Sequence, residues 1–351
     1  MFKKLLIFSL CLVMILSFSA CKSDKDVSSN LSTGTQIEEE KIELKGTNPL
    51  TGLKMDENLY LNKPLALVLE NSTTVQGVQT GHGKFDVLYE TIVEGGITRM
   101  LGVTKDPSVL AQVGNVRSAR EVFLELACGH DANMVHWGFD YFHFAELKNS
   151  LGINTLDLNG NGKYCFREPN GLSSEHTGYT KGEMLINGIT DKKFPTTTKN
   201  PDWIKFNDEE TVTTPAAVAK TVTVPFSGSY VTGFNYDAQT GLYVKNNKGK
   251  VWTDCKTGEK AEFKNVFVLF TTIVPHNCGS YQGDTKNHYK VHLEGGTGYY
   301  ISNGGYEEIT WTKGGPTNAL SFKKADGTEL TANAGKSYVC ITKTGSSVAF
   351  S

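Results

Sequence analysis

The chain has 351 residues, with 35 Lys and Arg against 37 Asp and Glu, and 39% of its residues are hydrophobic. This composition excludes a collagen, a generally disordered chain and a multi-pass membrane protein. The balanced charge offers no basic surface for nucleic acid, so no nucleic-acid partner is expected. At roughly 100–200 residues per domain, the length predicts two folded parts.

The beginning of the chain has the pattern of a secretory signal peptide over residues 1–20. Lysines precede an apolar run at residues 5–18, which is too short for a permanent membrane span. The segment Phe18-Ser19-Ala20-Cys21 resembles a bacterial lipobox, whose cysteine is diacylated and becomes the first mature residue. The sequence therefore predicts lipidation at Cys21 and a location on the outer face of the cytoplasmic membrane. The alternative is an ordinary cleaved signal with a chance cysteine.

The rest of the chain divides into four parts that differ in composition and periodicity. Residues 21–47 are rich in Ser, Lys and Glu and predict a flexible tether. Strand and helix patterns alternate over 48–195, weak periodicity over 196–224 predicts a connector, and short strands with turns fill 225–351. These patterns predict an α+β protein, with strands and helices in an N-terminal domain over 48–195 and a β-rich C-terminal domain over 225–351.

Periodicity predicts the main elements of the first part. A buried strand is expected at 64–69, a hairpin at 85–94 and 97–104, a strand at 134–137 and a helix at 140–151. Ser118 and Glu121 have capping-box spacing at the start of another helix, and Thr180 with Glu183 opens a third.

The hairpin carries two carboxylates. With a two-residue turn at Gly95-Gly96, Ile92 faces Arg99, and Glu90, Glu94 and Arg99 share one face. The two glutamates would lie roughly 13 Å apart, beyond the spacing of paired catalytic acids. Either they form an exposed ion-pair face or they line one wall of a site.

Arg117-Ser118-Ala119-Arg120 is the most informative segment. Two cations at a helix N-terminus are unfavourable, because the positive end of the helix macrodipole lies there. An anion or a protein carboxylate bound at that end would compensate for them. The candidate anion-binding residues are Arg99, Arg117, Ser118, Arg120 and Arg167. An internal ion-pair network with the hairpin is the alternative.

Two histidines are candidates for acid–base chemistry. His136 lies in a predicted strand, where a hydrogen-bonded core role is ordinary, and His176 lies in a polar loop. Catalysis would require these rings to converge with Glu90 or Glu94.

One segment matches the calcium-loop pattern through Asp157, Asn159, Asn161 and Glu168. Pro169 stops the helix that should follow, so a Gly-Asn turn competes with the metal interpretation. The sequence has no P-loop, G-x-S-x-G, H-E-x-x-H, C-x-x-C or dinucleotide fingerprint, and no cofactor is expected.

Three motifs in order resemble the YerB-like bacterial lipoprotein family. They are Phe85-Asp86-Val87-Leu88-Tyr89-Glu90, Glu94-Gly95-Gly96-Ile97-Thr98-Arg99 and Val116-Arg117-Ser118-Ala119-Arg120. The likeness extends over residues 48–345 and includes His136, Glu175-His176-Thr177 and Trp311-Thr312-Lys313. The resemblance implies a layered α/β sandwich-type N-terminal domain followed by a β-rich C-terminal domain. It further implies a Gram-positive envelope lipoprotein whose two domains are of unknown function, and it implies no reaction.

Two functional hypotheses follow. The first is a membrane-anchored binding or scaffold protein that recognises an anionic group on a cell-wall polymer or an envelope protein through its arginines. The second is an enzyme acting on wall glycan or peptide through Glu90 or Glu94 with His136 or His176. A purely structural Arg–Glu cluster is a third possibility.

Overall fold

A computed structural model describes residues 43–139, 144–281 and 284–351. The signal peptide, Cys21 and most of the predicted tether therefore lie outside the described residues. The end of the predicted tether contacts the body, because Lys45 pairs with Asp202 at 2.9 Å and Thr47 forms a β-bridge with Lys54. No helix among the described residues has the length and apolar character needed to cross a bilayer.

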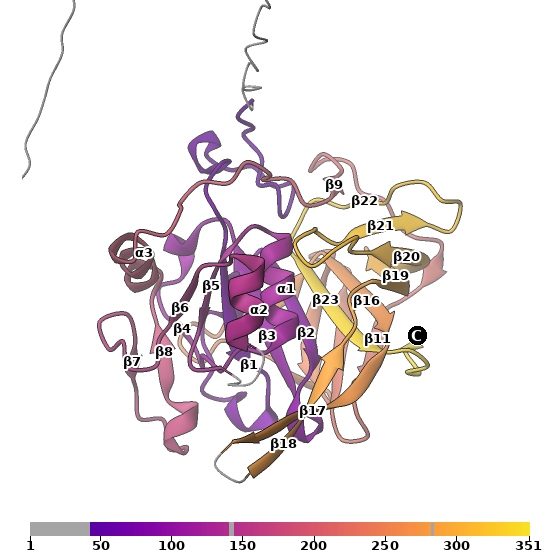
Figure 1. The fold of residues 1–351 in the computed structure, drawn as a ribbon. Helices are drawn as coiled ribbons and strands as arrows, with labels where there is room; N and C mark the ends of the chain where they lie inside the picture. The colour runs from indigo at the N-terminus through magenta and orange to yellow at the C-terminus, as the bar shows by residue number, and fades with distance from the viewer. Residues whose placement is uncertain (1–42, 140–143, 282–283) are drawn as a thin grey trace, which may run out of the picture. The chain divides into compact units, whose positions relative to one another are not determined.

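One sheet of eleven strands runs through the body (Figure 1). In spatial order its strands are β10 (Ala217–Val218), β20 (Gly305–Thr312), β19 (Gly295–Ser302), β16 (Asn265–Thr271), β23 (Ser337–Lys343), β2 (Val87–Ile92), β3 (Thr98–Thr104), β1 (Leu65–Glu70), β5 (Asn133–His136) and β6 (Thr155–Asp157), with β21 (Ser321–Lys324) beside β20. Strands from both predicted parts therefore share this sheet, joined by the parallel pair β2–β23.

A second sheet contains β14 (Lys250–Val251), β13 (Leu242–Asn247), β12 (Val231–Asp237), β11 (Thr221–Pro225) and β24 (Ala349–Phe350), with β15 (Glu262–Phe263) beside β13. Smaller pairings join β17 (Ile273–Tyr281) with β18 (Asp284–Val291), β22 (Thr331–Ala332) with β9 (Lys205–Phe206), and β8 (Gly178–Thr180) with β4 (Val113–Gly114) and β7 (Phe166–Arg167). The predicted connector 196–224 thus contributes β9 and β10 and begins β11.

The three described α-helices all precede residue 192. They are α1 (Glu121–Gly129), α2 (Phe144–Leu151) and α3 (Gly182–Asp191). The protein is accordingly α+β, as expected, and it is mostly sheet. The layered packing predicted for its first half and the division into two domains stay predictions.

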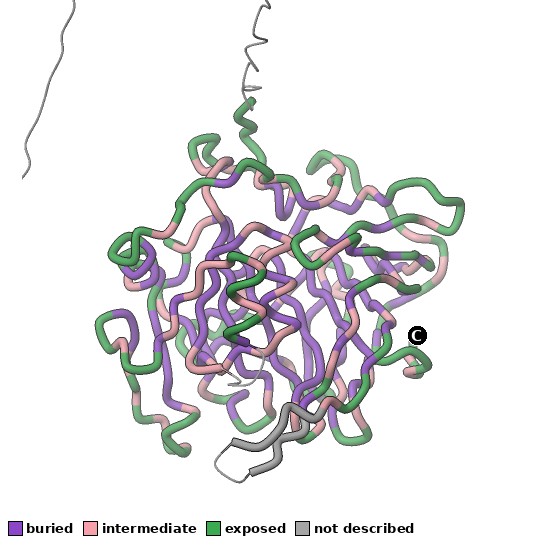
Figure 2. Tube along the Cα trace, in the orientation of Figure 1, coloured by how far each residue is buried: buried purple, intermediate pink, exposed green. Residues whose placement is uncertain are grey.

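Two hydrophobic cores cover the two faces of the long sheet, and Figure 2 shows its strands buried at the centre. In β1, Ala66 and Val68 face the core shared with α1, while Leu67 and Leu69 face the core shared with β11–β13. An uninterrupted apolar run is what a strand covered on both sides requires, so the predicted strand at 64–69 forms as β1.

The predicted two-residue hairpin turn is wrong, because the turn contains three residues. Glu94–Gly96 forms a 3-10 turn closed by a 2.8 Å hydrogen bond from Val93 N to Ile97 O. Arg99 therefore pairs with Thr91 instead of Ile92, and a one-residue shift places a side chain on the other face. Glu90 and Arg99 consequently lie on opposite faces of the sheet.

Gly95 provides a clean test of this turn. Its φ is +69°, and a Cβ added there would have no neighbour within 4 Å, so only backbone strain opposes a side chain. We expect Gly95→Ala to lower the free energy of unfolding by about 1 kcal/mol, measured by urea denaturation. Gly77→Ala is the control, because that Cβ also meets nothing and Gly77 does not have the left-handed φ. Equal stability of both variants would contradict the turn geometry.

Candidate functional site

Four segments of the chain converge on a cavity of about 190 Å³, here called the arginine pocket. It is lined by Val116, Arg117, Ser118, Trp137, Arg167, Glu175 and Gly178. Three of the predicted anion-binding residues, Arg117, Ser118 and Arg167, are thus brought together. The whole sequence contains four arginines, and two of them line this pocket.

Backbone pairing explains why Arg117 and Trp137 meet. Arg117 N donates to Val68 O of β1, and Trp137 N donates to Arg117 O, both at 3.0 Å. Ala119 N donates to Gly138 O, also at 3.0 Å. The segment before α1 is therefore held extended between β1 and the end of β5.

This pairing also overturns the predicted capping box. Helix α1 begins at Glu121 with Arg120 as its N-cap residue, and no side chain caps it. Ser118 Oγ instead donates to Trp137 O at 3.0 Å. Because residues 117–119 are tied to 137–138, the chain becomes helical only after Arg120.

Arg117 is held by acceptors on two sides. Its Nη1 donates to Glu175 O at 2.8 Å and lies 3.3 Å from Glu175 Oε2, while Nη2 lies 3.2 Å from the same carboxylate oxygen. Its Nε lies 3.6 Å from Glu70 Oε2. The side chain is 16% exposed, so the guanidinium is oriented and still reachable.

Glu70 supports the pocket from behind. The carboxylate is only 3% exposed and accepts from Ser72 Oγ at 2.7 Å, with His176 Nδ1 at 2.9 Å. A buried carboxylate needs cationic or hydrogen-bonding partners, and Arg117, Ser72 and His176 provide them. Sequence analysis missed Glu70, whose one signal is an acidic residue closing the apolar run of β1.

Arg167, the last residue of β7, also lines the pocket. Its Nη1 donates to Ser174 O and lies 3.2 Å from Thr177 Oγ1. The guanidinium carbon is 4.6 Å from the centroid of Trp137, a cation–π distance. A Cβ at Gly178 would lie 2.9 Å from Trp137 Cε3, so this glycine leaves room for the indole that orients Arg167.

The other two predicted arginines lie outside the arginine pocket lining. Arg120 Nε donates to Glu94 Oε1 at 2.5 Å, which is the internal pair with the hairpin that the alternative interpretation expected. Arg99 Nη1 donates to Ser118 O at 2.6 Å and is almost fully buried. Burial raises the pKa of Glu94, but Arg120 and Arg99 outweigh it and hold that pKa below its usual value.

Glu90 is not on an exposed face. The second sheet covers the face of β2 that carries Glu90, so this side chain is completely buried and its carboxylate accepts four hydrogen bonds. The donors are Asn71 Nδ2 at 2.5 Å, Thr98 Oγ1 at 2.7 Å, Thr232 Oγ1 at 2.9 Å and Tyr338 OH at 2.6 Å. Glu90 and Glu94 therefore have separate surroundings, one enclosed and one held by Arg120.

The two candidate histidines also have separate partners. His136 is buried, with Nδ1 2.9 Å from Gly138 O and 3.7 Å from Asp157 Oδ1, and burial lowers its pKa. His176 contacts Glu70 and lies 3.7 Å from Glu175 Oε1. Only His176 adjoins the arginine pocket through its contacts.

The calcium-loop residues make other contacts. Asp157 Oδ1 accepts from Gly138 N at 2.8 Å and Asn159 N at 2.9 Å, and Asn161 Nδ2 donates to Asp157 O. Glu168 binds Lys256 at 2.5 Å and Gln112 at 3.0 Å. Within the described ranges, no group of three or more His, Cys, Asp or Glu residues could hold a metal ion.

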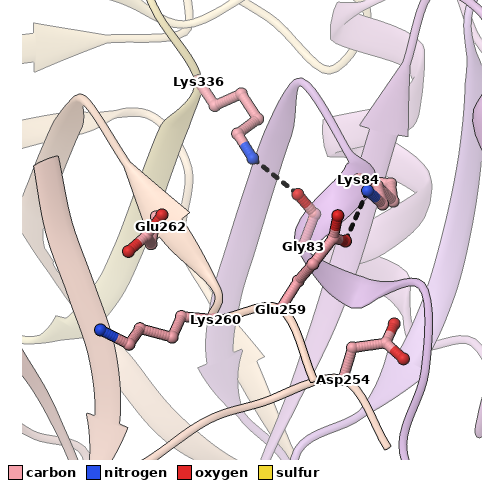
Figure 3. Close-up of a pocket in the computed structure, with 7 residues that line it drawn as sticks. All are labelled: Gly83, Lys84, Asp254, Glu259, Lys260, Glu262 and Lys336. Carbon is pink, nitrogen blue, oxygen red and sulfur yellow. Dashed lines mark hydrogen bonds and ion pairs between the residues drawn. The ribbon is translucent and has the colours of Figure 1, made fainter. Parts of the chain in front are cut away.

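A second cavity of about 370 Å³ provides a comparison (Figure 3). It is lined by Gly83, Lys84, Asp254, Glu259, Lys260, Glu262 and Lys336. Lys84 pairs with Glu259 at 2.5 Å and Lys336 Nζ donates to Gly83 O at 2.7 Å. Its three cations and three carboxylates leave no excess of either charge, and we call it the lysine cavity.

The architecture defines an α+β protein in which one long sheet joins sequence-distant strands. The chain belongs to the family described as "Protein of unknown function (DUF3048)", matching its N-terminal domain over residues 50–195 and its C-terminal domain over residues 222–339. The predicted YerB-like resemblance is thereby confirmed.

Two relatives support this assignment. The chain is 27% identical over 300 residues to a Bacillus subtilis (strain 168) protein named "Putative lipoprotein YerB", covering 84% of this chain and 85% of that protein. The crystal structure of YerB protein from Bacillus subtilis matches with a TM-score of 0.71 at 24% identity, covering 87% of this chain and all of that one. The structural match establishes the fold alone.

Proposed function

We propose that the chain is a lipid-anchored extracytoplasmic protein that binds an anionic group of a cell-wall polymer in the arginine pocket. The lipobox-like segment ending at Cys21 and the name of the Bacillus subtilis relative support the anchor. Anchoring would place the protein on the outer face of the cytoplasmic membrane. An envelope protein presenting an acidic side chain is the competing partner.

The observation that carries the proposal is the placement of Arg117 and Arg167 around one cavity of about 190 Å³. Guanidinium groups form strong, directional hydrogen bonds with carboxylates and phosphates, especially when held in place. A small concave cavity fits a group projecting from a polymer, whereas protein partners use broad surfaces. These features favour a wall polymer over a protein.

Wall binding provides the test. The chain after the predicted signal peptide, carrying Cys21→Ser, would be mixed with purified Gram-positive walls and sedimented. We expect salt-sensitive co-sedimentation, weakened at least tenfold in a folded Arg117→Ala/Arg167→Ala variant, since each charge-assisted hydrogen bond contributes about 1.5–3 kcal/mol.

Matched variants distinguish specific binding in the arginine pocket from nonspecific electrostatic attraction to the wall. Lys84→Ala/Lys260→Ala removes two cations from the lysine cavity and should leave binding unchanged. Arg117→Lys/Arg167→Lys keeps the charge without the fork and should bind at an intermediate level. Equal loss in the lysine-cavity variant would contradict a specific site.

The enzymatic alternative depends on Glu90, Glu94, His136 and His176. His176 is favoured among them, because Glu70 orients its ring beside the pocket. Mass spectrometry of the same supernatant distinguishes the two functions. If the wild-type chain releases fragments and the His176→Ala variant does not, the protein is an enzyme and the binding function is wrong.

A further inference from the structure

Glu175 already occupies the anion-binding side of Arg117. It belongs to the 3-10 turn Ser174–His176, and its Oε2 lies 3.2 Å from Arg117 Nη2. Its side chain is 60% exposed, in contrast to the buried carboxylate of Glu70 on the same guanidinium. Arg117 is the main cause that holds the pKa of Glu175 below its usual value.

The two sides of Arg117 differ in how firmly they are bound. Nε faces the buried Glu70, and Nη1 donates to the Glu175 backbone carbonyl at 2.8 Å. Both acceptors are fixed by the fold and would remain if the Glu175 side chain turned away. Nη2 is bound by the Glu175 carboxylate, which an exposed side chain can withdraw at small cost.

The charge balance of the pocket indicates which kind of group would replace the Glu175 carboxylate. Apart from His176, which contacts both carboxylates, the charged side chains are Arg117 and Arg167 on one side of the balance and Glu70 and Glu175 on the other. Withdrawing Glu175 leaves one positive charge in excess, which a single negative charge would neutralise. A single carboxylate oxygen, Glu175 Oε2, contacts both Nη1 and Nη2, so an oxygen of a ligand carboxylate would fit the same place.

We propose that Glu175 is an intramolecular competitor of the ligand. Its carboxylate occupies the binding position on Arg117 and is displaced by a carboxylate of the wall polymer. This inference rests on the proposed function and adds the ligand's chemical class and a residue that limits affinity. Glu175 also keeps Arg117 oriented while the pocket is unliganded.

Calorimetric titration with glucuronic acid tests the inference, with glucose as the matched sugar without a carboxylate. We expect only glucuronic acid to bind, and Glu175→Gln to bind it about two- to fivefold more tightly, the range for losing an exposed ion pair. Glu175→Ala is the second variant, and Glu259→Gln is the matched control. Glu259 is 54% exposed and paired with Lys84 in the lysine cavity.

A double-mutant cycle shows whether the gain acts through Arg117. In an Arg117→Ala background, Glu175→Gln should give no gain, because nothing remains for the carboxylate to block. Unchanged or weaker binding by both folded Glu175 variants, with Arg117 still required, would overturn displacement and leave the binding function intact. Preference for dimethyl phosphate would overturn the carboxylate class. Absence of binding to walls and to every probe would overturn both proposals.

Discussion

Replacing Glu90 by alanine is expected to lower the free energy of unfolding by about 3–5 kcal/mol, the range for removing one partner from a buried charged network. The carboxylate is fully buried and accepts from four side chains. Its removal leaves the hydroxyls of Thr98, Thr232 and Tyr338 and the amide of Asn71 without this acceptor. Buried donors that lose their acceptor account for the size of the effect.

Urea unfolding followed by circular dichroism measures this loss. Glu90→Gln keeps the shape and part of the accepting capacity and should give an intermediate value. Glu259→Ala is the control, because its pair with Lys84 is exposed and should contribute no more than about 1 kcal/mol. A loss below 1 kcal/mol for Glu90→Ala would show that the network does not hold the two sheets together.

Sequence patterns predicted the elements better than their registration. The apolar run of β1 and the helical period of α1 depend on neighbouring residues, which a single sequence displays directly. The hairpin register depended on whether the turn has two or three residues, and both versions place Gly95-Gly96 in it. That one-residue difference moved Arg99 to the other face of the sheet, whereas Glu90 lies in the core because the second sheet covers its face of β2.

The candidate site was predictable in part for a similar reason. Arg117 and Ser118 are local to one helix start, where a cation that opposes the macrodipole identified Arg117 as unusual and capping-box spacing identified Ser118. Glu70 reaches His176 across 106 positions and Trp137 meets Arg167 only after β5 and β7 are folded. Periodicity carries no information about such distant contacts, so the residues behind the pocket were missed.

Lys245 extends the hydrogen-bond network of Glu90, and its titration should have a large effect on the pH dependence of stability. It is fully buried, its Nζ donates to Asn71 Oδ1 at 3.2 Å, and it lies 3.3 Å from the centroid of Trp252. Burial lowers the pKa of Lys245 to about 7, although the Glu90 charge acts in the opposite direction. In an unfolded chain a lysine titrates near ~10.4.

The pH dependence of stability follows from this difference. Between about pH 7 and 10 the unfolded chain holds a proton that the folded protein has released, so unfolding takes up a proton. The free energy of unfolding should therefore rise with pH, by up to about 1.4 kcal/mol per pH unit from this group. Below about pH 7 both states are protonated and the contribution levels off at its lowest value.

Lys245→Met removes this titration while keeping a side chain of similar length. Urea unfolding at pH 7, 8 and 9 should give a shallower pH slope for Lys245→Met than for the wild type, whatever its absolute stability. Lys84→Met measures the effect of losing one exposed positive charge. Parallel profiles for the wild type and Lys245→Met would mean that Lys245 keeps its proton in the folded core, with Glu90 as its effective counter-charge.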